Sequence, residues 1–128
     1  MNITVGVDIS IREIQSILVD AFETSIGYWA FVKGYEEPHD LQYQLFPDNV
    51  VKYADYPVNT GGAVIVAEYD EGIEIDEHWL CMDSIKAGLQ LMAKNYPLNF
   101  CDILNGTYDA EDADMLVQLA TLGEVRYS

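Results

Sequence analysis

Two alternating runs joined by a turn constrain the fold more than any other feature of the sequence. Residues 61–70 (GGAVIVAEYD) alternate in strand fashion, with Val64 and Val66 on one face. The alternation resumes after Gly72 in residues 73–82 (IEIDEHWLCM). The Asp-Glu-Gly sequence between the runs is typical of a tight turn. The pattern therefore predicts an antiparallel hairpin, against which the rest of the chain must pack.

The first helix is predicted within residues 8–22 (DISIREIQSILVDAF). Ser10 and Glu13 have the spacing of a capping box, and Ile9 with Ile14 has that of a hydrophobic staple. The apolar stripe expected to face the core consists of Ile14, Ile17, Leu18, Ala21 and Phe22. Gly27 is expected to end this segment.

Three further helical segments follow the hairpin. From Asp83 onward the apolar period becomes helical, and Pro97 is expected to stop that helix. Residues 97–104 predict a short helix that ends at Asn105 and Gly106. Asp109 is the expected cap of a third helix, which Gly123 ends.

The remaining segments complete an α+β domain that spans residues 1–128. Residues 27–35 alternate as a strand, with Trp29, Phe31 and Lys33 on one face. Residues 50–53 and 124–127 are expected to form short strands. The order of elements favours a small antiparallel sheet with about three helices packed on one side. The connection from residue 36 to residue 61 is long, carries three prolines and shows no convincing period.

The charge balance excludes several classes of function. The chain carries 22 acidic residues against six lysines and arginines, which gives a formal net charge of −16. Binding of phosphates needs basic side chains, so neither nucleic acid nor an anionic membrane is an expected direct partner. No charged leader or membrane-length apolar run is present, which predicts a cytoplasmic protein. Cys81 and Cys101 are expected to be buried, reduced thiols.

The acidic residues suggest a binding surface. Those predicted to contact a partner are Glu68, Asp70, Glu71, Glu74, Asp76, Glu77, Asp109, Glu111, Asp112 and Asp114. Positions two apart on a strand lie about 6.6 Å apart on one face, so Glu74 and Asp76 are expected to be neighbours near the phosphate repeat of a nucleic-acid strand. The alternative interpretation is a solvated edge whose charges prevent aggregation.

No motif predicts an enzyme, a metal site or a cofactor. The acidic stretches lack the ligand spacing and the central glycine of an EF-hand. His78 and Cys81, with Cys101 and His39 as distant partners, do not have the spacing of a zinc site. The sequence also lacks a glycine-flanked nucleophilic serine and a glycine-rich phosphate loop that opens a helix.

Two stretches (AFETSIGYWA, and residues 88–128) resemble a family of small acidic phage and prophage proteins of unassigned function. The matching residues are Tyr28-Trp29, Gly88-Leu89, Met92-Ala93, Tyr96-Pro97 and Gly123-Glu124-Val125. Thr24 and Ser25 replace a glycine pair of the family, and Ser128 replaces its last glycine. The resemblance implies a shared fold and a phage origin. Small acidic phage proteins are often inhibitors of host machinery, including restriction and CRISPR systems.

Taken together, these features predict a non-enzymatic phage-type protein that inhibits a host nucleic-acid-handling protein. Its acidic face would bind the basic nucleic-acid-binding surface of that protein, as a nucleic-acid mimic or through charge attraction. The alternative is a phage accessory or assembly protein that binds its partner through the tyrosine-bearing loop at residues 36–61. A homodimer is compatible with either interpretation.

Overall fold

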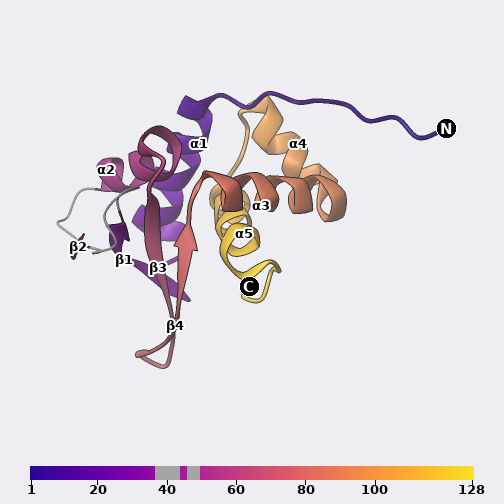
Figure 1. Ribbon diagram of the computed structural model, residues 1–128. Helices are drawn as coiled ribbons and strands as arrows, with labels where there is room; N and C mark the ends of the chain where they lie inside the picture. The colour runs from indigo at the N-terminus through magenta and orange to yellow at the C-terminus, as the bar shows by residue number, and fades with distance from the viewer. Residues whose placement is uncertain (37–43, 46–49) are drawn as a thin grey trace.

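The computed structural model describes residues 1–36, 44–45 and 50–128 of the chain (Figure 1). Within these residues an antiparallel sheet has the strand order β2-β1-β3-β4. The strands are β1 (Ala30–Glu36), β2 (Gln44–Leu45), β3 (Ala63–Asp70) and β4 (Ile73–Leu80). Together with the helices they form the predicted small α+β fold.

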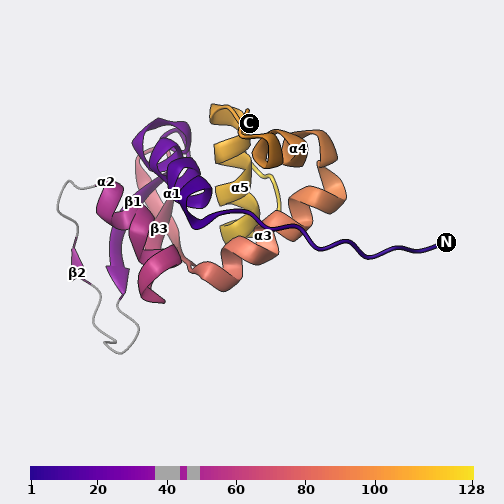
Figure 2. The same ribbon diagram turned by 90° about the horizontal axis from the view of Figure 1, so that it is seen from above.

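The helical layer is built from segments before and after the sheet hairpin. The α-helices are α1 (Ile11–Asp20), α2 (Val50–Asp55), α3 (Met82–Asn95), α4 (Pro97–Asn105) and α5 (Ala110–Leu122). A π-helical turn continues α1 as η1 (Ala21–Ser25), and another continues α2 as η2 (Tyr56–Thr60). Seen from above, α3, α4 and α5 lie together, away from β1 and β2 (Figure 2). None of the described helices is both long and apolar enough to cross a bilayer.

The helix ends predicted at Ser10, Pro97, Gly106 and Gly123 are confirmed, while the segment expected to end at Gly27 ends at Ser25, with Ile26 as its cap. Ser10 caps α1, because its hydroxyl accepts a hydrogen bond from the Glu13 amide at 3.1 Å. α3 ends before Pro97, which then occupies the first turn of α4. Gly106 and Gly123 follow α4 and α5 with φ angles of 70° and 75°, a left-handed conformation that favours glycine. These local rules set the helix boundaries.

The core lies between the helices and one face of the sheet, which we call the inner face. Val64, Val66 and Leu80 are fully buried there, and Ile17 and Leu116 meet them from α1 and α5. Burial of this apolar side-chain area supplies most of the driving force for folding.

α3 and α5 pack closely because of one glycine. A Cβ atom added at Gly88 would lie 2.9 Å from the backbone nitrogen of Ala120. No side chain can occupy that space unless the helices move apart. Gly88 therefore sets the distance between the two helices.

Two predicted short strands are wrong, each because of contacts with distant parts of the chain. Residues 50–53 begin α2, where Tyr53 is buried and its ring lies 5.6 Å from that of Tyr35. Residues 124–127 form no strand, because the side-chain oxygen of Gln118 accepts the amides of Arg126 and Tyr127 at 2.8 and 2.9 Å. A side chain thus takes the place that a neighbouring strand would have.

The first predicted strand also differs from the alternation in the sequence. Trp29 precedes β1 and is fully buried, whereas Phe31 is 46% exposed, so the two rings do not share a face. A bulge between Val32 and Gly34 shifts the register again, and the Lys33 side chain reaches across β3 to Glu77 of β4. The predicted burial of the cysteines is wrong, because Cys81 is half-buried and Cys101 is exposed; both are free thiols.

Candidate functional site: the acidic hairpin and the carboxylates beneath it

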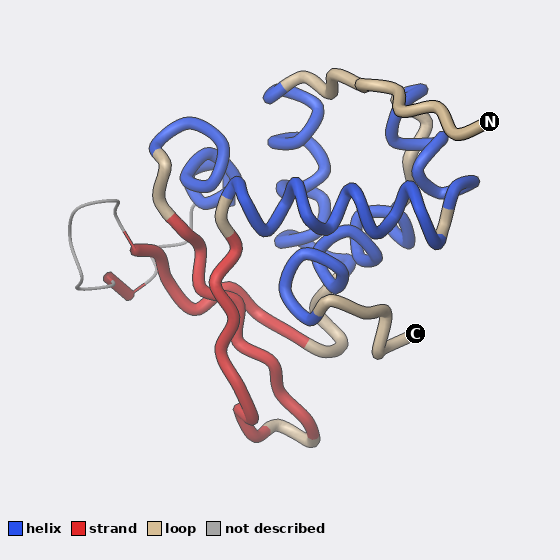
Figure 3. The backbone as a smooth tube through the Cα atoms, turned by 45° about the vertical axis from the view of Figure 1, so that its right-hand side comes forward, coloured by secondary structure: helices blue, strands red, loops and turns tan. Residues whose placement is uncertain are grey.

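The β3–β4 hairpin extends beyond the helical layer (Figures 1 and 3). Its turn is made by Glu71 and Gly72, with φ angles of 50° and 79°. Positive φ at both central residues is the geometry of a type I′ turn, which matches the twist of the flanking strands. The predicted turn is therefore confirmed, and the tip projects Asp70 and Glu71 into solvent.

An irregularity in β4 decides which hairpin carboxylates face the same way. Tyr69 pairs with Glu74, but Glu68 pairs with Asp76, so Ile75 is an extra residue in β4. A one-residue shift moves all following side chains to the other face. Glu74 and Asp76 therefore lie on opposite faces of the sheet, and the prediction that they form one row at the phosphate repeat is wrong.

On the outer face, opposite the core, Glu74 and Glu77 are tied to β1. Lys33 Nζ lies 3.0 Å from Glu74 Oε1 and also forms an ion pair with Glu77. Both contacts raise the pKa of the lysine above its ordinary value, that with Glu77 first. These two carboxylates are thus partly neutralised within the molecule.

A second contact spans the same face. The Trp79 indole donates a hydrogen bond to Glu36 Oε2 at 2.8 Å and so joins β4 to β1 across β3. Beneath these cross-strand contacts, Ile65 and Ala67 are fully buried although they lie outside the main core cluster. The side chains of the sheet itself cover the middle of this face, and Trp79 remains 46% exposed.

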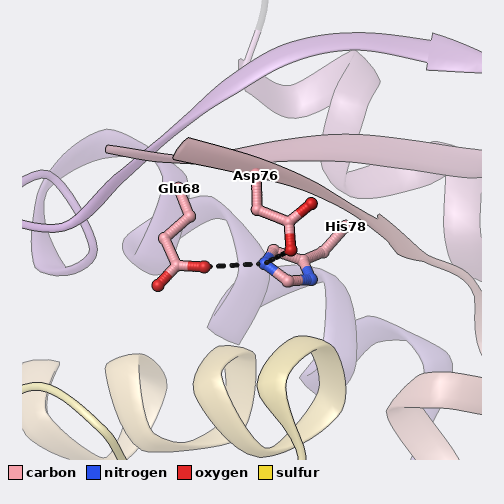
Figure 4. A group of neighbouring side chains, drawn as sticks. All are labelled: Glu68, Asp76 and His78. Atoms are coloured by element: carbon pink, nitrogen blue, oxygen red, sulfur yellow. Dashed lines mark hydrogen bonds and ion pairs between the residues drawn. The ribbon is translucent and has the colours of Figure 1, made fainter. Parts of the chain in front are cut away.

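Glu68 lies on the inner face and is nearly inaccessible, with 1% of its surface exposed. His78 Nε2 is 3.0 Å from Glu68 Oε1 (Figure 4). Arg126 Nη1 (3.1 Å) and the Tyr127 hydroxyl donate to the other oxygen, Oε2. Burial alone would raise the pKa of Glu68, but the bonds from Tyr127, His78 and Arg126 hold the pKa below its ordinary value. Its carboxylate therefore fastens the C-terminal segment to the sheet.

At the start of α5, two of the predicted acids form a reciprocal cap. The Asp109 side chain accepts from the Asp112 amide at 2.9 Å, and Asp112 accepts from the Asp109 amide at 3.1 Å. The Asn99 amide group also donates to Asp112, at 2.7 Å. Burial raises the pKa of Asp112 despite these donors. Asp112 is therefore a structural cap and not a surface charge.

Asp114, two residues further along α5, anchors the segment before β1. Its carboxylate accepts hydrogen bonds from the Tyr28 hydroxyl, from the Trp29 indole at 2.8 Å and from the Gln118 amide at 3.1 Å. Burial raises the pKa of Tyr28, and its hydrogen bond to Asp114 raises the pKa further. Three neutral donors hold this buried carboxylate.

The structure thus divides the ten predicted acids into two groups. Glu68, Asp112 and Asp114 are buried and bonded internally. Glu77 is half-buried, and the exposed members are Asp70, Glu71, Glu74, Asp76, Asp109 and Glu111. Of these, Asp70, Glu71, Asp109 and Glu111 form no ion pair with another described residue, and Asp109 is used as the cap of α5.

The loop predicted as an alternative interface is described only in part. Residues 37–43 and 46–49, with His39 and Tyr43, lie outside the described residues. Tyr53 and Tyr56 lie within them and are buried, and the ring of Tyr56 stacks on that of Tyr35 at 4.3 Å. These two tyrosines serve the core and offer no surface to a partner.

Glu68, Asp76 and His78 were not predicted to lie together, yet the structure brings them together. One ligand atom from each lies within 4.8 Å of the others. The hairpin turn was predictable, but the extra residue at Ile75 was not. In a regular hairpin without this bulge Ile75 would pair with Glu68, so Asp76 would pair with Ala67 and His78 with Ile65, on the face opposite Glu68. Local sequence pattern gives no indication of such a bulge.

Comparison with known proteins adds no relative. The chain matches no protein-family model, no curated protein and no solved structure.

Proposed function

We propose that this chain is a non-enzymatic binding protein whose acidic hairpin docks on the basic surface of a nucleic-acid-handling protein. The observation that carries the proposal is the projecting β3–β4 tip (Figure 3), where Asp70 and Glu71 form no ion pair with another described residue. Ile73 and Ile75 are 69% and 54% exposed beside them. Apolar side chains surrounded by charges are typical of a protein-binding surface.

The acidic surface continues toward the start of α5. The Tyr69 hydroxyl donates to the carbonyl of Gly27, and the neighbouring Tyr28 hydroxyl donates to Asp114. The hairpin and the first turns of α5 therefore flank the same short segment, and Glu111 is exposed there. Carboxylates from both elements can act on one partner, and their attraction would speed its association.

The resemblance to small acidic phage proteins supports a more specific role. We propose that the partner belongs to a restriction or CRISPR system and that the bound hairpin prevents it from engaging nucleic acid. Because Glu74 and Asp76 point to opposite faces, charge attraction is a better account than a copied phosphate repeat.

The test compares two variants of equal net charge. In the hairpin variant Asp70, Glu71 and Glu111 are replaced by lysine; in the control the exposed residues Asp8, Glu23 and Asp83 are replaced in the same way. Binding to purified restriction and CRISPR effector proteins is measured at about 50 and about 200 mM salt, with duplex DNA as a competitor.

We expect the wild type and the control variant to bind at low salt, to weaken steeply as salt rises, and to be displaced by DNA. The hairpin variant should not bind. An equal loss of binding in both variants would show that net charge alone matters. Binding that changes neither with salt nor with charge reversal would refute the electrostatic mechanism.

A further inference from the structure

We propose that Glu68, Asp76 and His78 form a binding site for a divalent transition-metal ion, with Zn²⁺ as the best-suited probe. The three side chains hang from β3 and β4 and meet between the sheet and α5 (Figure 4). Their ligand atoms lie within 4.8 Å of one another. An imidazole nitrogen with two carboxylate oxygens suits zinc and its first-row neighbours better than calcium or magnesium, which prefer oxygen ligands alone.

The distances between the ligand atoms suit such an ion. Zinc ligands lie at about 2.0–2.2 Å, so two ligand atoms around a tetrahedral ion are roughly 3.4 Å apart. His78 Nε2 is 3.0 Å from Glu68 Oε1 and 3.9 Å from Asp76 Oδ2, values on either side of that separation. The Asp76 side chain is 65% exposed and can close the longer distance by rotation.

Glu68 is oriented as a ligand should be. Arg126 and Tyr127 hold its Oε2 atom, which leaves Oε1 directed toward His78 (Figure 4). Metal-binding carboxylates are commonly fixed in this way by partners behind them. Because Asp76 is at the surface, water can complete the coordination.

Arg126 also gives the proposal a distinctive signature. Its guanidinium lies 3.1 Å from the far oxygen of Glu68, so its positive charge opposes a nearby cation. Removal of this charge should strengthen metal binding, whereas removal of a ligand should weaken it. A purely structural ion-pair network would show no such opposite responses.

The experiment is a calorimetric titration of ZnCl₂ into the chelator-treated full chain. Cys81 and Cys101 are first replaced by serine so that neither thiol competes for zinc; Cys81 caps α3, and serine can fill that role. The variants are Asp76→Asn, His78→Gln and Arg126→Gln. His39→Gln is the matched control, since His39 is the other of the two histidines in the sequence.

We expect one zinc ion per chain and a rise in thermal stability with zinc concentration. Asp76→Asn and His78→Gln should each weaken binding about tenfold or more, Arg126→Gln should tighten it, and His39→Gln should leave it unchanged. Circular dichroism establishes that each variant is folded, and Asp76→Asn, at an exposed side chain, keeps the test valid if His78→Gln unfolds. Absence of zinc binding, or equal losses in the His78 and His39 variants, would overturn the proposal.

Discussion

The acidic residues of the hairpin and those of α5 look alike in the sequence but do opposite work in the structure. At the hairpin tip, Asp70 and Glu71 are exposed and form no ion pair with another described residue. In α5, Asp112 and Asp114 are buried and accept hydrogen bonds from residues distant in the sequence. The tip carboxylates are free to contact a partner, whereas Asp112 and Asp114 stabilise the fold.

The difference follows from the surroundings at each place. A helix start has amide groups without partners, so Asp109 and Asp112 accept from them, while Asp114 accepts from side chains that pack on α5. A two-residue turn satisfies its own backbone and leaves its side chains in water. Acidic density alone therefore does not identify a surface, since the secondary structure decides where the charge lies.

The largest expected effect comes from Asp114→Ala. The substitution removes the acceptor for Tyr28, Trp29 and Gln118 and leaves the buried Trp29 indole without a partner, whereas Gln118 still donates to the carbonyl of Tyr127. We expect a loss of about 3–5 kcal/mol in the free energy of unfolding, measured by urea titration. Glu111→Ala, three positions earlier and exposed, should cost less than about 1 kcal/mol. If both substitutions lowered the free energy of unfolding equally, buried Asp114 and exposed Glu111 would not differ in their contribution to stability.

Glu68→Gln should have an intermediate effect that depends on pH. The pKa of Glu68 is lowered in the folded state, so its carboxylate stabilises the fold above the ordinary value of 4.5, and this stability is lost as the pH falls through the folded-state value. At pH 7 the variant should lose about 1–3 kcal/mol. Unfolding midpoints measured from pH 7 downward should converge with those of the wild type in acid. A stability difference that stays constant at every pH would contradict a lowered pKa of Glu68 in the folded state.

The smallest effect is expected at the hairpin tip. Asp70→Asn combined with Glu71→Gln removes two exposed charges that no described cation neutralises. The free energy of unfolding should change by less than about 0.5 kcal/mol, with a slight gain because repulsion falls. Thermal unfolding at low salt measures this change. A loss above about 1 kcal/mol would show that the tip carboxylates are structural after all.

Much of the fold was predictable because its determinants are local. Ser10, Pro97, Gly106 and Gly123 mark helix ends through contacts within a few residues, and the Glu71-Gly72 turn sets its own geometry. The amphipathic stripe of α1 also follows from sequence spacing alone.

The internal use of the acids was not predictable, because their partners are distant. Tyr28 and Asp114 are 86 positions apart, and Glu68 and Tyr127 are 59 apart. The bulge at Ile75 is a further case, since one unpaired residue decides whether His78 faces Glu68 or solvent. Each depends on tertiary packing, which local pattern does not encode.

The two tryptophans lie on either side of the sheet in contrasting surroundings. Trp29 is fully buried with its ring stacked on Tyr127 at 5.4 Å, whereas Trp79 is 46% exposed and bonded to Glu36. The intrinsic fluorescence of the chain therefore combines emission from the buried Trp29 with emission from the solvent-exposed Trp79. Acrylamide would quench Trp79 selectively, so a ligand that covers the outer face would protect Trp79 from quenching. Release of the C-terminal segment would expose Trp29 and shift its emission to longer wavelengths.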